Sequence, residues 1–421
     1  MSASLGARCG AAGVERSSTT FARDPALTGL RAVAALLVVG THAAFATGYL
    51  NHGYLGSIYA RLEIGVAVFF VLSGFLLFRP WVRAAAEGAP SPSLRRYSRH
   101  RVSRIVPAYL VAVTATFAIY TVFRPGPTPG QSWYGLVRYL TFTQTYTDDY
   151  LGTLLHPGLS QMWSMAVEVA FYVALPVLAY LILRVVCGGR WRPGRALAGL
   201  AGLALVAPAW IVLVHNTDLL PTSAGMWLPG HLWWFAGGMA LAVLQAIGVR
   251  CPAVFAVPAA AALFLVVSTP VGGSILGPDP AWVPVAKSLL YAVIATLLVA
   301  PPALGGGDSY SRVLASRPMV WLGEISYEIF LLHVVAIALT LHLVLAWPLF
   351  TGSMPGLMAA TLALTVPAAW LLHRATGPQR RLRSDGSSAR NAAPRCETAS
   401  FSAALSSAAV RAEPVGRNTG S

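Results

Sequence analysis

Lysine and acidic residues are scarce in this chain. Lys287 is the only lysine among 30 basic residues, and aspartate and glutamate together number 15. Charged residues make up 11% of the 421 residues, whereas hydrophobic residues make up 56% and the mean hydropathy is +0.62. A soluble protein of this length cannot bury so much apolar surface, so the composition indicates a polytopic membrane protein.

Cysteine is also rare, and its spacing excludes two classes of site. The four cysteines match neither a metal-binding nor a disulfide pattern, so we predict no metal site. They are Cys9, Cys187, Cys251 and Cys396. The net charge of +15 is carried by no soluble basic domain, which excludes nucleic-acid binding as the function. An Arg- and Ser-containing segment precedes the first apolar run, so we expect no cleavable signal peptide.

Apolar runs of roughly twenty residues recur along the chain, and the alternation typical of a membrane barrel is absent. We therefore predict an all-α protein with about ten transmembrane helices. The predicted spans are approximately 27–48, 62–80, 102–123, 161–184, 196–215, 231–248, 252–270, 282–304, 325–347 and 354–373. The aromatic segment 133–146 is too short for another span, and we expect it at the interface or re-entrant.

The distribution of arginine predicts the orientation. If the N-terminus is cytoplasmic, nearly all arginines of the connecting segments fall inside, as the positive-inside rule requires. The outside then receives Arg61, Arg124 and Arg138 together with four aspartates. Both termini are therefore expected in the cytoplasm, with residues 23–383 forming a domain in the inner (cytoplasmic) membrane. Segments 1–22 and 384–421 lack apolar runs, and we expect them to be disordered.

The first predicted span carries two residues that are costly to place in lipid. Ten residues, none of them ionisable, separate Arg31 from His42, so the two lie roughly 16 Å apart along a helix. One interpretation is structural, with Arg31 reaching the interface and His42 bonded to a neighbouring helix. The other is a functional pair, with the guanidinium at one membrane face and the imidazole near mid-depth.

The loop before the third span is the most basic part of the sequence. Attraction to anionic lipid of the inner leaflet explains most of its arginines. Arg101 and Arg104 differ, because their spacing places both on one helix face where the chain enters the bilayer. Two guanidiniums there are suited to bind a phosphorylated cytoplasmic molecule.

Carboxylates inside predicted spans are functional candidates by default. Glu168 lies about two turns into the fourth span, between Trp163 and Tyr172. The competing interpretation is a buried glutamate that only ties two helices together. Glu63 lies at the very start of the second span, near the outer interface, and further along this span Ser73 and Gly74 favour close packing against another helix.

The ninth span places Ser326 and His333 along one helix face, with Tyr327 beside Ser326. A single histidine on an apolar helix is more often structural than catalytic, and His333 is therefore a secondary candidate.

These segments together resemble the acyltransferase-3 family, whose members are ten-helix integral membrane O-acyltransferases. The matching motifs are Leu27-Thr-Gly-Leu-Arg31 with His42, Phe69-Phe-Val-Leu-Ser-Gly-Phe-Leu, Arg101-Val-Ser-Arg104-Ile-Val-Pro-Ala-Tyr109, Trp163-Ser-Met-Ala-Val-Glu168 through Tyr172, and Ser326-Tyr-Glu-Ile-Phe-Leu-Leu-His333. They follow the order of the family and span roughly residues 24–380.

The resemblance implies transfer of an acyl group, by default acetyl or another short acyl, from cytoplasmic acyl-CoA to a hydroxyl of a sugar-containing acceptor. It implies no permanently bound cofactor. A cell-envelope polysaccharide, a glycolipid and a glycosylated metabolite all remain open as acceptors. His42 would be the catalytic residue, and Arg31, Arg101 and Arg104 would bind the acyl-CoA. The preference for arginine over lysine suggests a GC-rich bacterial genome.

Three positions depart from the family pattern. Ala67 stands where many members carry aspartate, Val169 replaces a second glutamate after Glu168, and the last span ends at His373 without the usual glutamate. Glu63 and Glu168 remain as candidate carboxylate partners of His42. The alternative function is a proton-coupled transporter or flippase, whose paired, broken helices the sequence does not show.

Overall fold

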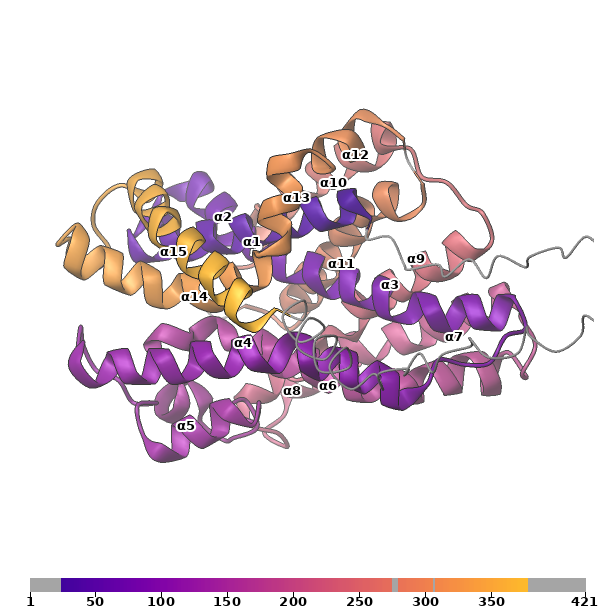
Figure 1. Cartoon of the computed structure of the whole chain (residues 1–421), viewed down its shortest axis with the longest axis horizontal. Helices are drawn as coiled ribbons and strands as arrows, with labels where there is room; N and C mark the ends of the chain where they lie inside the picture. Colours follow the sequence, from indigo (N-terminus) through magenta and orange to yellow (C-terminus); the bar gives the residue numbers. More distant parts are fainter. Residues whose placement is uncertain (1–23, 275–278, 306, 378–421) are drawn as a thin grey trace, which may run out of the picture. The chain divides into compact units, whose positions relative to one another are not determined.

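The structure is a computed structural model, and it describes residues 24–274, 279–305 and 307–377. The segments 1–22 and 384–421, predicted to be disordered, lie outside the described residues. The described residues form helices and no strands (Figure 1), which confirms the prediction of an all-α protein.

The α-helices are α1 (Pro25–Ala46), α2 (Gly53–Arg61), α3 (Gly65–Ala86), α4 (Leu94–Val122), α5 (Trp133–Leu140), α6 (Trp163–Tyr180), α7 (Pro193–Ala204), α8 (Val206–Asn216), α9 (Leu232–Ala246), α10 (Ala253–Val267), α11 (Trp282–Ala303), α12 (Ser309–Leu314), α13 (Arg317–Glu324), α14 (Ser326–Leu339) and α15 (Met354–Thr376). Short 3-10 helices are η1 (Tyr49–Asn51), η2 (Leu62–Ile64), η4 (Pro157–Met162), η6 (Thr222–Met226), η7 (Leu228–His231) and η8 (Pro270–Gly272). Single π-helical turns are η3 (Tyr150–Leu154), η5 (Leu181–Val186) and η9 (Thr340–Val344).

Eight helical segments of the described chain are long and apolar enough to cross a membrane. They are Pro25–Ala46, Gly53–Ala86, Leu94–Val122, Pro157–Val186, Pro193–Asn216, Trp282–Ala303, Ser326–Val344 and Met354–Thr376. Each overlaps one of the ten predicted spans, although Gly53–Ala86 and Leu94–Val122 begin well before the predicted 62–80 and 102–123. The other two predicted spans, 231–248 and 252–270, form the 15-residue helices α9 and α10. The chain is therefore a multi-pass membrane protein.

Helix α1 begins at Pro25 for local reasons and then runs through the centre of the helix bundle. The Asp24 carboxylate accepts hydrogen bonds from the backbone N–H groups of Ala26 (3.0 Å) and Leu27 (3.4 Å), which caps the helix. Proline suits the first helical position because its missing N–H would have no partner there. Beyond this start, α1 packs against α3, α13, α14 and α15 (Figure 1), and its side chains therefore meet those of several helices.

Helices α3 and α9 pack so closely at two glycines that a larger residue at either position would clash with the opposite backbone. A Cβ atom at Gly74 would lie 2.2 Å from the carbonyl oxygen of Phe235, and one at Gly238 would lie 1.9 Å from that of Val71. The close packing predicted for Gly74 is thus confirmed, and its partner is α9.

A buried histidine anchors the segment that leads into α6. The Nε2–H group of His156 donates to Gln131 Oε1 at 2.8 Å, while its Nδ1 accepts from the backbone N–H of Gly158 at 3.1 Å. Both contacts need a neutral ring, since a protonated ring has no lone pair for Gly158. Burial lowers the pKa of His156 to about 4, so the ring stays neutral at physiological pH.

Candidate active site

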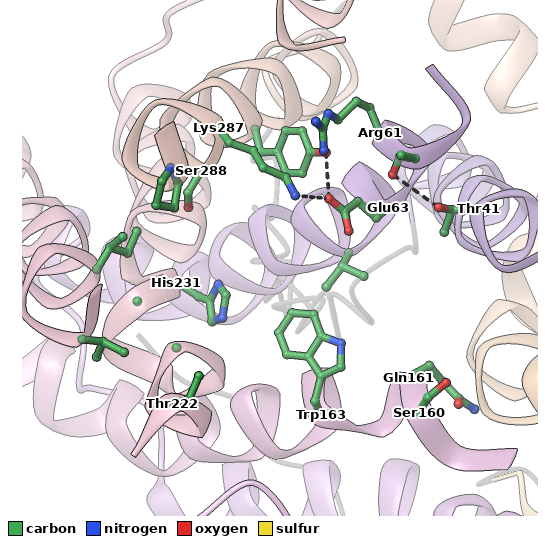
Figure 2. Close-up of a pocket in the computed structure, with 18 of the residues that line it drawn as sticks. Thr41, Arg61, Glu63, Ser160, Gln161, Trp163, Thr222, His231, Lys287 and Ser288 are labelled. Atoms are coloured by element: carbon green, nitrogen blue, oxygen red, sulfur yellow. Dashed lines mark hydrogen bonds and ion pairs between the residues drawn. The ribbon is translucent and has the colours of Figure 1, made fainter. Parts of the chain in front are cut away.

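A cavity of about 1140 Å³ lies between α1, the start of α3, the start of α6, α8 and α11. Its lining combines aromatic rings with ionisable and hydroxyl groups. The residues on which the site is built are His42, Glu63, Gln161, Trp163, His231, Trp234, Lys287, Ser288 and Tyr291. Figure 2 labels Glu63, Gln161, Trp163, His231, Lys287 and Ser288 among them. A cavity with apolar walls and a few convergent polar groups is the usual form of a small-molecule site.

His42 extends from α1 and lines this cavity. Its Nδ1 lies 2.8 Å from the carbonyl oxygen of Val38, one helical turn earlier. A carbonyl oxygen only accepts, so Nδ1 carries the proton and Nε2 holds a lone pair in the neutral ring. The half-buried His42 is thereby held as the tautomer whose Nε2 can act as a base.

His333 is the second residue that orients His42. It is fully buried on α14, and its Nδ1 donates to the carbonyl oxygen of Phe330 at 2.7 Å. Its Nε2 therefore holds a lone pair, and this atom lies 3.4 Å from His42 Nδ1. The two rings meet edge to face with their centroids 4.9 Å apart. Although 291 residues separate them in the sequence, the fold brings the two histidines together.

No carboxylate of the described residues hydrogen-bonds to His42. Glu63 lines the same cavity and lies within electrostatic range of His42, but its bonds go elsewhere. Glu63 Oε1 receives Lys287 Nζ at 2.5 Å and the Tyr291 hydroxyl at 3.0 Å. Neither of the candidate carboxylate partners, Glu63 and Glu168, is bonded to His42, and the group that faces His42 Nδ1 is Nε2 of His333.

Glu168 joins two helices through hydroxyl groups. Its Oε1 accepts a hydrogen bond from Ser73 on α3 at 2.7 Å and another from Tyr172, one turn further along α6. These contacts are those of a glutamate that ties helices together, which was one of the two interpretations of the sequence. A direct part of Glu168 in the chemistry remains a prediction.

The three candidate arginines lie away from the cavity lining. Arg101 and Arg104 extend from the first turns of α4, and both lie within electrostatic range of the Tyr172 hydroxyl. Arg101 is half-buried and Arg104 is exposed. The half-buried Arg31 is on α1, eleven residues before His42.

Other predicted residues have structural contacts. The Ser326 hydroxyl donates to the carbonyl oxygen of Gly323 at 2.8 Å, and the Tyr327 hydroxyl donates to that of Ile105 on α4 at 3.0 Å. Trp163 lines the cavity, and its ring centroid lies 5.3 Å from that of His231.

Two cavity residues, Lys287 and His231, were not predicted from the sequence. The signal for Lys287 was present, because the only lysine of the chain lies in an apolar span. His231 appeared to lie at a span end, and only the fold shows that it lines the cavity with Trp163 and Trp234.

A family model described as an acyltransferase domain matches residues 24–374. The chain belongs to the acyltransferase-3 family. It is 29% identical over 377 residues to the acyltransferase MdmB of Streptomyces mycarofaciens, covering 83% of this chain and 90% of that relative. It is 25% identical over 346 residues to the peptidoglycan O-acetyltransferase OatA of Listeria monocytogenes, covering 77% of this chain and 51% of OatA.

The O-acetyltransferase OatA of Staphylococcus aureus is 22% identical over 334 residues, covering 73% of this chain and 50% of that protein. The chain thus spans about half the length of the OatA relatives. No solved structure matches the chain. The acyltransferase-3 resemblance is therefore confirmed, and the protein is a membrane O-acyltransferase.

The structure gives a physical account of two departures from the acyltransferase-3 pattern. Ala67 is completely buried among apolar residues of α3 and its neighbours, where a carboxylate would need a partner. At the end of α15, His373 Nδ1 lies 2.9 Å from Glu328 Oε1, so the acidic group of this contact is on α14. Neither position supplies a carboxylate to His42.

Proposed function

We propose that this acyltransferase moves a short acyl group, by default acetyl, from cytoplasmic acyl-CoA to a hydroxyl of a sugar-containing acceptor bound in the cavity. The observation that carries the proposal is His42, which lines the cavity while its Nδ1–H group is bonded to Val38 and faces His333. Its Nε2 lone pair is the proton acceptor that this reaction requires.

The donor and the acceptor approach His42 from opposite sides. The phosphates of CoA are multiply anionic and stay at the expected cytoplasmic end, where Arg31, Arg101 and Arg104 are suited to bind them. The pantetheine arm is long and nearly neutral, and it carries the thioester toward mid-depth. The order of residues along α6 supports this path, because Tyr172, near Arg101 and Arg104, follows the cavity residue Trp163 by nine positions, toward the expected cytoplasmic end of the helix.

The chemical step is a direct transfer. The acceptor hydroxyl oxygen attacks the thioester carbonyl carbon as His42 Nε2 removes the hydroxyl proton. The C–S bond then breaks, and the departing CoA thiolate takes the proton from the imidazolium. Holding both substrates beside His42 supplies much of the remaining acceleration. No covalent acyl-enzyme is required.

His42→Ala tests this proposal. We expect the purified variant to fold and insert normally and to lose transfer of radiolabelled acetyl from acetyl-CoA to membrane glycans and lipids, by a factor of roughly 10² to 10⁴. His52→Ala is the matched control, because His52 is an exposed histidine outside the cavity. Retained turnover by His42→Ala would refute the assignment of the base.

A further inference from the structure

The cavity wall beside His42 contains an ion pair that neither gives nor takes a proton in the proposed transfer step. Glu63, in η2 just before α3, and Lys287, on α11, contact each other through Glu63 Oε1 at 2.5 Å (Figure 2). The side chains are 43% and 31% exposed, so both groups can reach a molecule in the cavity.

The supporting contacts fix the orientation of this pair. The buried Tyr291 hydroxyl donates to the same Glu63 oxygen at 3.0 Å. The buried Arg61 is held by the carbonyl oxygens of Val267 (3.1 Å) and Gly273 (2.7 Å), which anchors the chain just before Glu63. No hydrogen bond from a described residue reaches Glu63 Oε2.

The free oxygen faces the cavity. In Figure 2 it is turned away from Lys287, toward the side on which Trp163 lies. The pair therefore presents a carboxylate acceptor next to an ammonium donor, with the indole of Trp163 and the ring of His231 across the same cavity. Neighbouring hydroxyls of a sugar match this arrangement, because one hydroxyl donates to the carboxylate and the next accepts from the ammonium.

The charge of the pair also selects among sugars. Glu63 and Lys287 neutralise each other, so the wall offers no net charge to attract an ionic group. Because the two groups are adjacent, a sugar carboxylate placed against Lys287 also lies near Glu63, and a sugar ammonium placed against Glu63 also lies near Lys287. Either contact brings like charges together in a site of reduced dielectric.

We propose that Glu63 and Lys287 form the recognition site for neighbouring hydroxyls on an uncharged sugar ring of the acceptor. This inference rests on the proposed function, because it takes the cavity to be the acceptor site. A pair that only joins the start of α3 to α11 would instead contribute to stability without affecting sugar binding.

Direct binding tests the pair without relying on turnover. The probes are methyl β-D-glucopyranoside, which is neutral, and methyl β-D-glucuronide, which is anionic, titrated at millimolar concentration into the purified full chain. We expect the wild type to bind the neutral glycoside more tightly. Glu63→Gln and Lys287→Met should each raise its Kd about tenfold or more, since each removes a charge-assisted hydrogen bond. Glu63→Asp, which keeps the carboxylate, should restore part of the affinity.

The matched control is Glu87→Gln, which removes the exposed Arg83–Glu87 pair outside the cavity and should leave the Kd unchanged. Unchanged binding by the folded double variant E63Q/K287M, equal or tighter binding of the glucuronide, or no binding of the neutral glycoside would overturn the inference. Glu63-dependent binding by a wild type that transfers no acetyl from acetyl-CoA would support the pair and refute the proposed function.

Discussion

Replacing His333 by phenylalanine tests whether His333 only positions His42 or itself takes part in catalysis. The substitution keeps a ring beside His42 and Phe330 but removes the nitrogen that faces His42 Nδ1 at 3.4 Å. The shorter bond of His42 to the Val38 carbonyl, at 2.8 Å, remains, so the reactive tautomer should persist. A neutral hydrogen bond contributes roughly 0.5–1.5 kcal/mol, which corresponds to a two- to about tenfold lower kcat.

The assay compares kcat and KM for acetyl-CoA in His333→Phe and His42→Ala. We expect the first variant to retain at least about a tenth of wild-type kcat with an unchanged KM, and the second to lose roughly 10²-fold or more. The pH dependence of kcat should change in His333→Phe if the residue acts through His42, whereas a purely structural defect would lower the amount of folded protein instead. If His333→Phe is as inactive as His42→Ala, His333 itself takes part in proton transfer and the assignment of a single base is wrong.

Two further predictions concern the donor side and the fold. Arg101→Ala should raise the KM for acyl-CoA by about tenfold or more, because it removes a charge-assisted contact. Arg83→Ala, which removes an exposed arginine paired with Glu87, should leave this KM unchanged. Equal KM values for the two variants would exclude Arg101 from donor binding. Because burial lowers the pKa of His156 from 6.5 to about 4, its contribution to stability is complete above pH 6.5 and is lost as the pH falls toward 4. Thermal unfolding measured between pH 7.5 and pH 4.5 should show that the free energy of unfolding is lower by roughly 3 kcal/mol at pH 4.5. This loss should be smaller in His156→Gln and unchanged in His52→Gln, which alters an exposed histidine; identical pH profiles for all three proteins would refute the role of His156.

The positions of the long apolar helices were predictable because they depend on local properties. Apolar runs of membrane length set the helices, and Asp24 followed by Pro25 sets the start of α1. The aromatic segment 133–146, expected not to span, contains only the eight-residue helix α5. The sequence did not show that 231–248 and 252–270 form helices of only 15 residues, because the flanking turns depend on contacts with other parts of the chain.

The site was predictable only where one segment carries its own signal. His42 was identified because an imidazole inside an apolar helix is costly, and the same reasoning applied to Lys287 would have found it. The contacts among these residues were not predictable, because they come from packing between distant segments. His333 on α14 lies against His42, and Lys287 on α11 pairs with Glu63. Neither the spacing nor the periodicity of the sequence encodes such contacts.

A neutral partner for His42 suits a reaction inside a membrane. A carboxylate bonded to the imidazole would have to be desolvated in every resting molecule, whereas the Val38 carbonyl and His333 orient the ring without a charge. In the proposed reaction a charge appears on His42 only when it removes the acceptor proton. Glu63 lies within electrostatic range of His42 and shares the cavity, so its negative charge favours the imidazolium at that moment. Because Lys287 and Tyr291 already hold one of its oxygens, Glu63 can do this from a fixed position while its other oxygen contacts the sugar. The same carboxylate would then contribute both to acceptor binding and to proton transfer.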